Sequence, residues 1–231
     1  MQRLSLAAFL AIFLPLAGLA ETSQTSGTCP GIDVTATAPE ADLFDLICET
    51  AIDQAARLSA CGILPARPIR VTAVPKIEGL PVNCVGAFHC ERNEIMIVSP
   101  ETLESRDAPD FIYKGLKPKA AFVSILRHEL THALLEHTTE DRPISSAAHE
   151  YIAYAFQIDA MSDDERTAFL ETNGRVQAKS LDTFNMVIHS FVPGRFASAV
   201  WLHFGAPENG CGFVRDVIEG RVVLGTPLRF P

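Results

Sequence analysis

The segment RHELTHALLEH, residues 127–137, places His128 and His132 four positions apart, with Glu129 directly after the first histidine. Residues four apart on an α-helix lie on one face, so two imidazoles at this spacing can bind one metal ion. Glu129 projects about 100° from His128 around the helix axis. That direction is poor for a third ligand but suits contact with a metal-bound water. The three residues therefore predict metal-assisted hydrolysis with Glu129 as the general base.

The pattern around this motif predicts a buried helix from about Lys119 to His137. At 100° per residue, apolar side chains cover one broad side and also flank the two histidines. The remaining narrow stripe is polar and consists of Ser124, Arg127, Thr131 and Thr138. Buried imidazoles and carboxylates need partners, and a metal ion satisfies both histidines at once. The alternative is an ordinary core in which these side chains are satisfied without a metal.

A catalytic zinc site needs a third protein ligand and one open coordination position. Glu150 follows His132 by 18 positions, and a turn around Pro143 can bring its helix back antiparallel. The adjacent His149 is the rival ligand, and because neighbouring helix residues diverge by about 100°, only one of the two should bind. His137 is expected to be solvent-exposed and favoured by the C-terminal end of its helix.

With these residues the chain resembles the gluzincin branch of the zincin metallopeptidases, which includes thermolysin-like and smaller minimal peptidases. In those families H-E-x-x-H on one helix is completed by a glutamate on the next. The resemblance covers residues 119–160 well, and the preceding strands from about residue 68 more loosely. It implies that His128, His132 and Glu150 bind Zn²⁺ and that Glu129 is the base.

The chain departs from the gluzincin pattern after Glu150. Gluzincins often carry an aspartate a few residues later that holds the first histidine, but here Tyr154 follows four residues later and the next acid is Asp159. Tyr154 shares a helix face with Glu150, and we predict that it is catalytic, either supporting a ligand or donating to an oxyanion. Packing of its ring in the core is the alternative. His189 and His203 are further candidates for electrophilic assistance, or else surface or core histidines.

Residues 1–20 have the features of an export signal: Arg3, an apolar LAAFLAIFLPLAG stretch and a small-residue ending before Glu21. The stretch is too short for a membrane span and Pro15 interrupts it, although a retained anchor helix is the alternative. Residues 21–36, rich in Ser, Thr and Gly, are predicted to be an irregular leader. Residues 37–231 are predicted to form a single zincin-like domain.

Six cysteines follow the predicted signal, namely Cys29, Cys48, Cys61, Cys84, Cys90 and Cys211. An even number after an export signal predicts up to three disulfides and a periplasmic or secreted protein. Cys48 and Cys61 should not pair, because one shared helix would hold their Cα atoms roughly 20 Å apart. Cys84 and Cys90 can close a small loop if the chain turns at Gly86. A cysteine zinc knuckle is the rival interpretation, but no C-x-x-C pair is present.

The fold class predicted from these patterns is α+β. Strands are expected at PIRVTAV (68–74), VGAF (85–88) and NEIMIVS (93–99). They form a small mixed sheet, followed by the active-site helix and a mainly helical C-terminal region. Further helices are expected near 37–62 and 145–160, and from a capping box at Ser162–Glu165 to about Gly174.

Charge and motifs narrow the function. A formal net charge of −9 makes nucleic acid and anionic membranes poor partners, and neither a Gly-rich phosphate loop nor a G-x-S-x-G elbow occurs. The expected function is that of an exported zinc metallopeptidase acting on peptide or protein substrates, which would pair with an exposed strand at 85–88. The alternatives are a catalytically inactive zincin-like scaffold that binds a partner outside the cytoplasm, and a disulfide-stapled interaction domain without metal.

Overall fold

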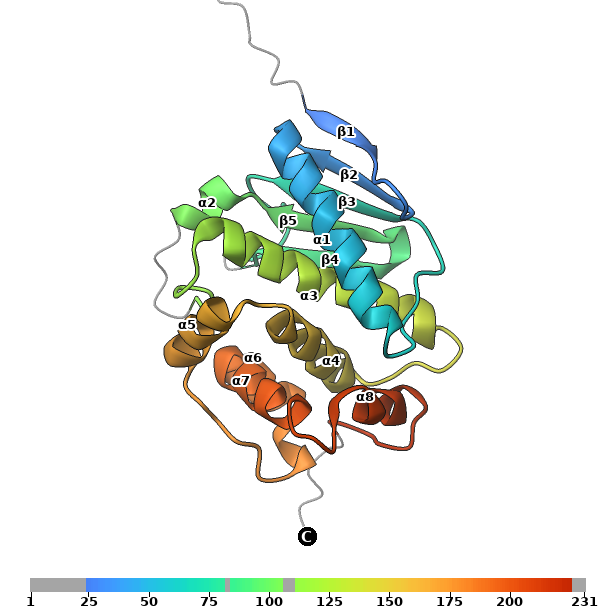
Figure 1. Cartoon of the computed structure of the whole chain (residues 1–231), viewed down its shortest axis with the longest axis vertical. Coiled ribbons are helices and arrows are strands. Elements are labelled where there is room, and N and C mark those ends of the chain that lie inside the picture. The colour runs from blue at the N-terminus through green and yellow to red at the C-terminus, as the bar shows by residue number, and fades with distance from the viewer. Residues whose placement is uncertain (1–23, 82–83, 106–110, 226–231) are drawn as a thin grey trace, which may run out of the picture.

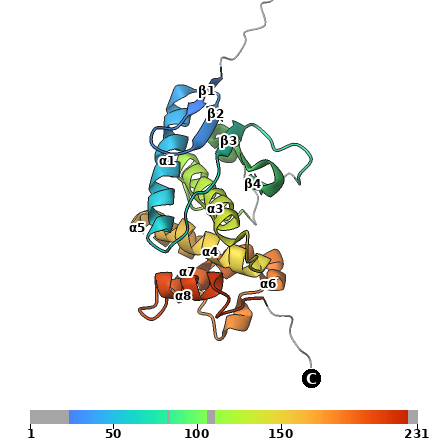
Figure 2. The same cartoon turned by 90° about the vertical axis from the view of Figure 1, so that its right-hand side faces the viewer.

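The computed structural model describes residues 24–81, 84–105 and 111–225. Its architecture is α+β, as predicted: a five-stranded mixed sheet is followed by a helical region (Figures 1 and 2). The signal predicted at residues 1–20 lies outside the described residues. Among the helices of the described ranges, none combines the length and apolar character that crossing a membrane requires.

The sheet contains β1 (Thr25–Thr28), β2 (Val34–Ala38), β3 (Ile69–Val74), β4 (Gly86–His89) and β5 (Glu94–Val98). The strand order is β1-β2-β3-β5-β4. The three central strands β2, β3 and β5 are parallel, whereas β1 and β4 are antiparallel at the two edges.

The prediction of an irregular leader at residues 21–36 is wrong for the described part of that segment, because this part contains β1 and most of β2. The TSGT segment of β1 has no apolar alternation, and its four residues are extended by pairing with β2. VTATA of β2 does alternate, with Val34, Ala36 and Ala38 buried. Side chains this small give a weak strand pattern, and the Ser, Thr and Gly content obscured it.

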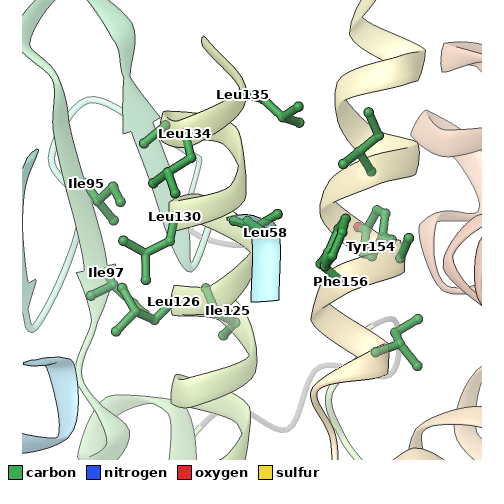
Figure 3. Packing of buried hydrophobic residues seen from close by; sticks show 14 of the residues in the cluster. Leu58, Ile95, Ile97, Ile125, Leu126, Leu130, Leu134, Leu135, Tyr154 and Phe156 are labelled. Atoms are coloured by element: carbon green, nitrogen blue, oxygen red, sulfur yellow. The ribbon is translucent and has the colours of Figure 1, made fainter. Parts of the chain in front are cut away.

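Helices α1 (Ala41–Ser59) and α3 (Pro118–Thr139) cover one face of the sheet (Figure 1). The short α2 (Pro100–Glu104) precedes α3. In Figure 3, Leu126, Leu130 and Leu134 of α3 point toward Ile95 and Ile97 of β5. All five side chains are almost fully buried. This contact fixes the rotation of α3, and therefore the direction in which its histidines point.

The polar stripe of α3 is buried against its neighbours. Arg127 donates through Nη1 to Asp53 Oδ2 at 2.6 Å and to Gln54 Oε1 at 3.1 Å, both on α1. Gln54 in turn donates to Thr131 Oγ1 at 2.9 Å. Apolar packing on the sheet and this hydrogen-bonded contact with α1 together hold α3 in place.

The C-terminal region is helical, as predicted. It comprises α4 (Ser146–Asp159), α5 (Asp163–Asn173), α6 (Met186–Phe191), α7 (Pro193–Phe204) and α8 (Gly210–Ile218). The capping box between Ser162 and Glu165 is present at the start of α5. α4 packs along α3, and α6, α7 and α8 lie on the side of α4 that faces away from α3 (Figure 1).

Two disulfides are formed, Cys29–Cys48 and Cys61–Cys211. Cys48 and Cys61 have separate partners, as the spacing argument required. Cys84 and Cys90 do not bond to each other. The strand β4 lies between them, and a strand advances about 3.3 Å per residue, so the two cysteines lie at opposite ends of β4 instead of closing a loop.

Candidate metal centre

Three predicted ligands converge between α3 and α4. His128 Nε2 lies 3.0 Å from His132 Nε2 and 3.4 Å from Glu150 Oε2, and His132 Nε2 lies 3.6 Å from Glu150 Oε1. Two ligands about 2.05 Å from a tetrahedral ion are about 3.3 Å apart. The measured distances are near that value, although they reach two different oxygens of Glu150, and one ligand atom from each residue lies within 4.8 Å of the others, so these residues could hold a metal ion.

The start of α4 sets the position of Glu150. Ser145 is the N-cap of α4, with its Oγ accepting from the Ala148 N–H at 3.1 Å. Its hydroxyl also donates to the Leu224 carbonyl at 2.8 Å, which ties this end to the C-terminal segment. Glu150 therefore lies at the beginning of the second turn of α4, facing the histidines of α3.

His128 has a second partner that the sequence did not predict. Its Nδ1 lies 2.9 Å from Gln157 Oε1, and the Gln157 amide nitrogen donates to Tyr113 Oη at 2.9 Å and Ser124 Oγ at 2.8 Å. Gln157 lies seven residues after Glu150, two helical turns along α4. The available signal was that spacing, at which an amide can accept the same hydrogen bond as the acid of the gluzincin pattern.

The charges of the metal-free site are strongly coupled. Burial alone would raise the pKa of Glu150, but the hydrogen bond with His128 and the histidine charges outweigh it and hold this pKa at about 2. Burial alone would lower the pKa of His128, but Glu150 raises it above the usual value. Burial and the neighbouring His128 cation lower the pKa of His132 to about 3. One positive charge is therefore held between Glu150 and the histidines.

Glu129 is buried beside the ligands without joining them. Burial, with some help from the Glu150 charge, raises the pKa of Glu129 to about 7, against the opposing effects of His128 and a hydrogen bond from the Phe88 backbone. Gly86 permits this close approach of strand and helix: a Cβ added there would lie 2.6 Å from Ile125 Cγ2 and 2.8 Å from Glu129 Oε1.

A cleft of about 1210 Å³ opens over these residues. One wall is β4, one of the two edge strands of the described sheet. The others come from α3, α4, the segment before α3, and the α6 region with Phe191 and Pro193. The cleft brings the ligands, Glu129 and an unpaired strand edge into one solvent-accessible space.

Of the other candidate site residues, Tyr154 and His189 lie beside the ligands, whereas His149 and His203 do not join them. Tyr154 lines the cleft with its ring centroid 4.5 Å from that of His128, and His189 Nε2 lies 3.4 Å from Glu150 Oε2. His149 stacks its ring against His132 at 5.9 Å, outside the ligand triangle. His203 lies away from the centre, where its Nδ1 is 2.6 Å from the hydroxyl of Tyr151.

The prediction that His137 is solvent-exposed is wrong, since the residue is buried, with 7% of its surface exposed. Its Nε2–H donates to Asn93 Oδ1 at 2.8 Å, and its Nδ1 accepts from the Ala66 N–H at 3.4 Å. Asn93 has a left-handed backbone (φ 49°) between β4 and β5. The segment between α1 and β3 covers this end of α3, so His137 links the helix to the β4–β5 connection.

Comparison with known proteins supplies a family but no activity. A family profile described as "Family of unknown function (DUF6639)" matches residues 34–227. No curated protein and no solved structure matches the chain.

Proposed function

We propose that this chain, which belongs to the DUF6639 family of unknown function, is a zinc-dependent peptidase that acts outside the cytoplasm. The observation that carries the proposal is the triangle of His128, His132 and Glu150 in a cleft, with Glu129 adjacent but outside it. A purely structural metal site has no use for a buried carboxylate beside an open coordination position.

The donor set favours zinc. Two imidazoles and one carboxylate leave the fourth tetrahedral position open, as in catalytic zinc sites. When bound, zinc would act as a Lewis acid and lower the pKa of a coordinated water toward about 7. Glu150 supplies the single negative charge of the set, and the low pKa of its carboxyl keeps it ionised across the physiological range.

Glu129 is the proposed general base. A carboxylate whose pKa is about 7 can accept a proton and return it near neutral pH. The returned proton would go to the amine that leaves when the peptide bond breaks. Tyr154 and His189, which line the same cleft, are proposed to donate to the developing oxyanion. Burial raises the pKa of Tyr154 well above its usual value, which keeps its hydroxyl protonated as a donor.

The edge of β4 supports a peptide as substrate. Val98 N–H donates to the Val85 carbonyl at 2.9 Å, so the alternation of antiparallel ladders turns the backbone groups of Gly86 and Phe88 away from β5. These groups face the cleft, where the Phe88 N–H hydrogen-bonds Glu129. An extended peptide can add to this edge by backbone hydrogen bonds.

Location outside the cytoplasm is supported by Cys29–Cys48 and Cys61–Cys211, since disulfides persist in oxidising compartments. Export through residues 1–20 is part of the same proposal.

The test combines metal analysis with peptide cleavage. The exported protein and its Glu129→Gln variant are purified, bound metal is measured by mass spectrometry, and both are incubated with a diverse peptide mixture. One zinc per chain in both, with cleavage only by the unaltered protein, supports the proposal. Zinc without cleavage would favour the inactive binding scaffold. Iron in the site, which a two-histidine, one-carboxylate set also accepts, or no metal at all, would contradict the proposal.

A further inference from the structure

Gln157 occupies a place in the metal centre that the proposed reaction does not use. We propose that Gln157 is a positioning residue with two effects: it makes His128 bind metal through Nε2, and it leaves the centre more positive than a carboxylate partner would. The inference rests on the metal site of the proposed function, but not on peptide hydrolysis.

The Gln157 amide turns its nitrogen toward two hydroxyls and its oxygen toward His128. The Gln157 nitrogen has two hydrogens, and two hydroxyls lie within reach, Tyr113 Oη at 2.9 Å and Ser124 Oγ at 2.8 Å. With both hydrogens donated, the carbonyl oxygen faces His128 Nδ1 at 2.9 Å. An acceptor at that position requires a proton on Nδ1. The lone pair of His128 then lies on Nε2, the atom that faces His132 and Glu150.

Burial restricts the hydrogen-bond partners that these side chains can have. Gln157 is 0% exposed, and Ser124 and Tyr113 are also buried. A buried polar group that loses its partner costs about 1–3 kcal/mol, so a His128 that binds metal through Nε2 and carries its proton on Nδ1 needs the acceptor that the Gln157 oxygen supplies. Tyr113 precedes α3 and Ser124 belongs to α3, so contacts from two segments hold the Gln157 amide of α4 against His128.

The choice of an amide has an electrostatic consequence. A glutamate at 157 has nearly the same shape, and the hydroxyls of Tyr113 and Ser124 can rotate to donate to it. A carboxylate partner raises the basicity of a metal-bound imidazole. Glu150 is the only anionic ligand of the described group, so a divalent ion with these ligands has a net charge of about +1, and the neutral amide of Gln157 does not offset that charge as a nearby carboxylate would. Compared with a chain that has glutamate at 157, a bound ion would therefore be held less tightly. It would also withdraw more electron density from the ligand at its fourth coordination position.

Three variants separate positioning from simple packing. Gln157→Leu removes the acceptor at similar size, Gln157→Glu keeps the acceptor and adds a charge, and Ser124→Ala removes one amide partner while leaving the His128 contact. Zinc affinity is measured by competition with a chromogenic chelator at one pH. ¹⁵N NMR of the zinc-loaded proteins identifies which nitrogen of His128 carries the proton.

The unaltered protein and Ser124→Ala should both show a slowly exchanging Nδ1–H proton on His128. Gln157→Leu should lose that protected proton and bind zinc about 10–100-fold more weakly, the usual effect of removing such a partner. Gln157→Glu should bind zinc about tenfold more tightly and shift the Nδ1–H resonance downfield.

Metal bound through Nδ1 in the unaltered protein, or a folded Gln157→Leu variant within twofold of its affinity, would overturn the positioning role. Weaker or unchanged zinc binding in Gln157→Glu would overturn the charge effect. If Gln157→Leu does not fold, the proton position in Gln157→Glu and the unaltered protein decides the positioning role. None of these measurements uses a peptide, so the inference can stand even if no peptide is cleaved.

Discussion

The Nε2 atoms of His128 and His132 lie 3.0 Å apart. Two imidazole lone pairs at that distance repel each other unless a proton or a metal ion lies between them. In the metal-free protein a proton on His128 fills this place, and Glu150 favours it by raising the pKa of His128 against the effect of burial. A metal ion would replace this proton in a site that is already assembled.

Metal binding should therefore stabilise the folded chain. At a free zinc concentration of about 100 times Kd, binding raises the free energy of unfolding by about 2.7 kcal/mol. For a chain of this length the corresponding rise in Tm is roughly 5–11 °C. Differential scanning calorimetry with added zinc measures the shift, and an excess of chelator should reverse it.

Variants of neighbouring histidines provide the control. His132→Ala should abolish the zinc-dependent shift in Tm, whereas His149→Ala should retain it, since His149 stacks on His132 without joining the ligand group. Loss of the shift in His149→Ala but not in a Glu150→Gln variant would reverse the assignment of the third ligand.

Gly86→Ala should damage the reaction while sparing the metal. The added methyl would lie 2.8 Å from Glu129 Oε1 and 2.6 Å from Ile125 Cγ2, so the strand or the carboxylate must move. A displacement of about 1 Å near the reacting groups can cost roughly 100-fold in rate. We expect peptide cleavage to fall roughly 10–100-fold, with zinc content unchanged.

Gly212→Ala is the matched control, because a Cβ there meets no atom within 4 Å. It should leave cleavage and metal content unaltered. A Gly86→Ala variant as active as Gly212→Ala would show that Glu129 tolerates the displacement or is not the base.

Patterns carried by short segments predicted much of this architecture. The buried helix around His128 and the capping box at Ser162 follow from periodicity and caps within a few residues of chain. Glu150 was placed by combining a turn with a family resemblance. β1 was missed because its TSGT segment owes its conformation to pairing with β2, which no local pattern reveals.

The remaining misses involve contacts between distant segments. His137 looks like a solvent-exposed residue at a helix end, and only the chain around Ala66 shows that it is covered. Gln157 was not predicted because the gluzincin pattern has a charged partner for the first histidine, whereas an amide can accept the same hydrogen bond. The pairing of Cys61 with Cys211 spans 150 residues and depends on how α8 packs.

Phe88→Pro tests the role of the β4 edge. The Phe88 N–H faces the cleft, where it hydrogen-bonds Glu129 outside the β4–β5 ladder, so proline removes a cleft-facing donor without breaking a strand hydrogen bond. Peptide cleavage should be lost while zinc content stays at one per chain. Phe88→Ala keeps the N–H and should retain activity. Equal turnover by the proline and alanine variants would exclude this edge as the peptide site.

The two disulfides should contribute unequally to stability. The chain-entropy relation gives about 5 kcal/mol for the 150-residue separation of Cys61–Cys211 and about 3 kcal/mol for the 19-residue separation of Cys29–Cys48. Paired serine substitutions of each bridge, compared by urea unfolding, measure the difference. Similar losses, or a larger loss at Cys29–Cys48, would mean that native contacts around the bridges outweigh loop entropy.

His137 should make stability depend on pH in a defined direction. Burial, followed by the Arg67 charge, lowers the pKa of His137 in the folded chain below its unfolded value of about 6.5. The neutral ring is needed, because Nδ1 accepts from the Ala66 N–H while Nε2–H donates to Asn93. Its contribution is therefore complete above about pH 6.5 and is lost as the pH falls through the lowered folded value.

His137→Gln removes this titration but keeps a donor and an acceptor. The urea midpoint of the zinc-saturated protein should fall more steeply between pH 7.5 and pH 5 than that of the variant. Other buried histidines titrate in both proteins, so the difference between the two curves isolates His137. Parallel curves would show that protonation of His137 is tolerated in the folded state, and that its bond to Asn93 alone secures the β4–β5 connection.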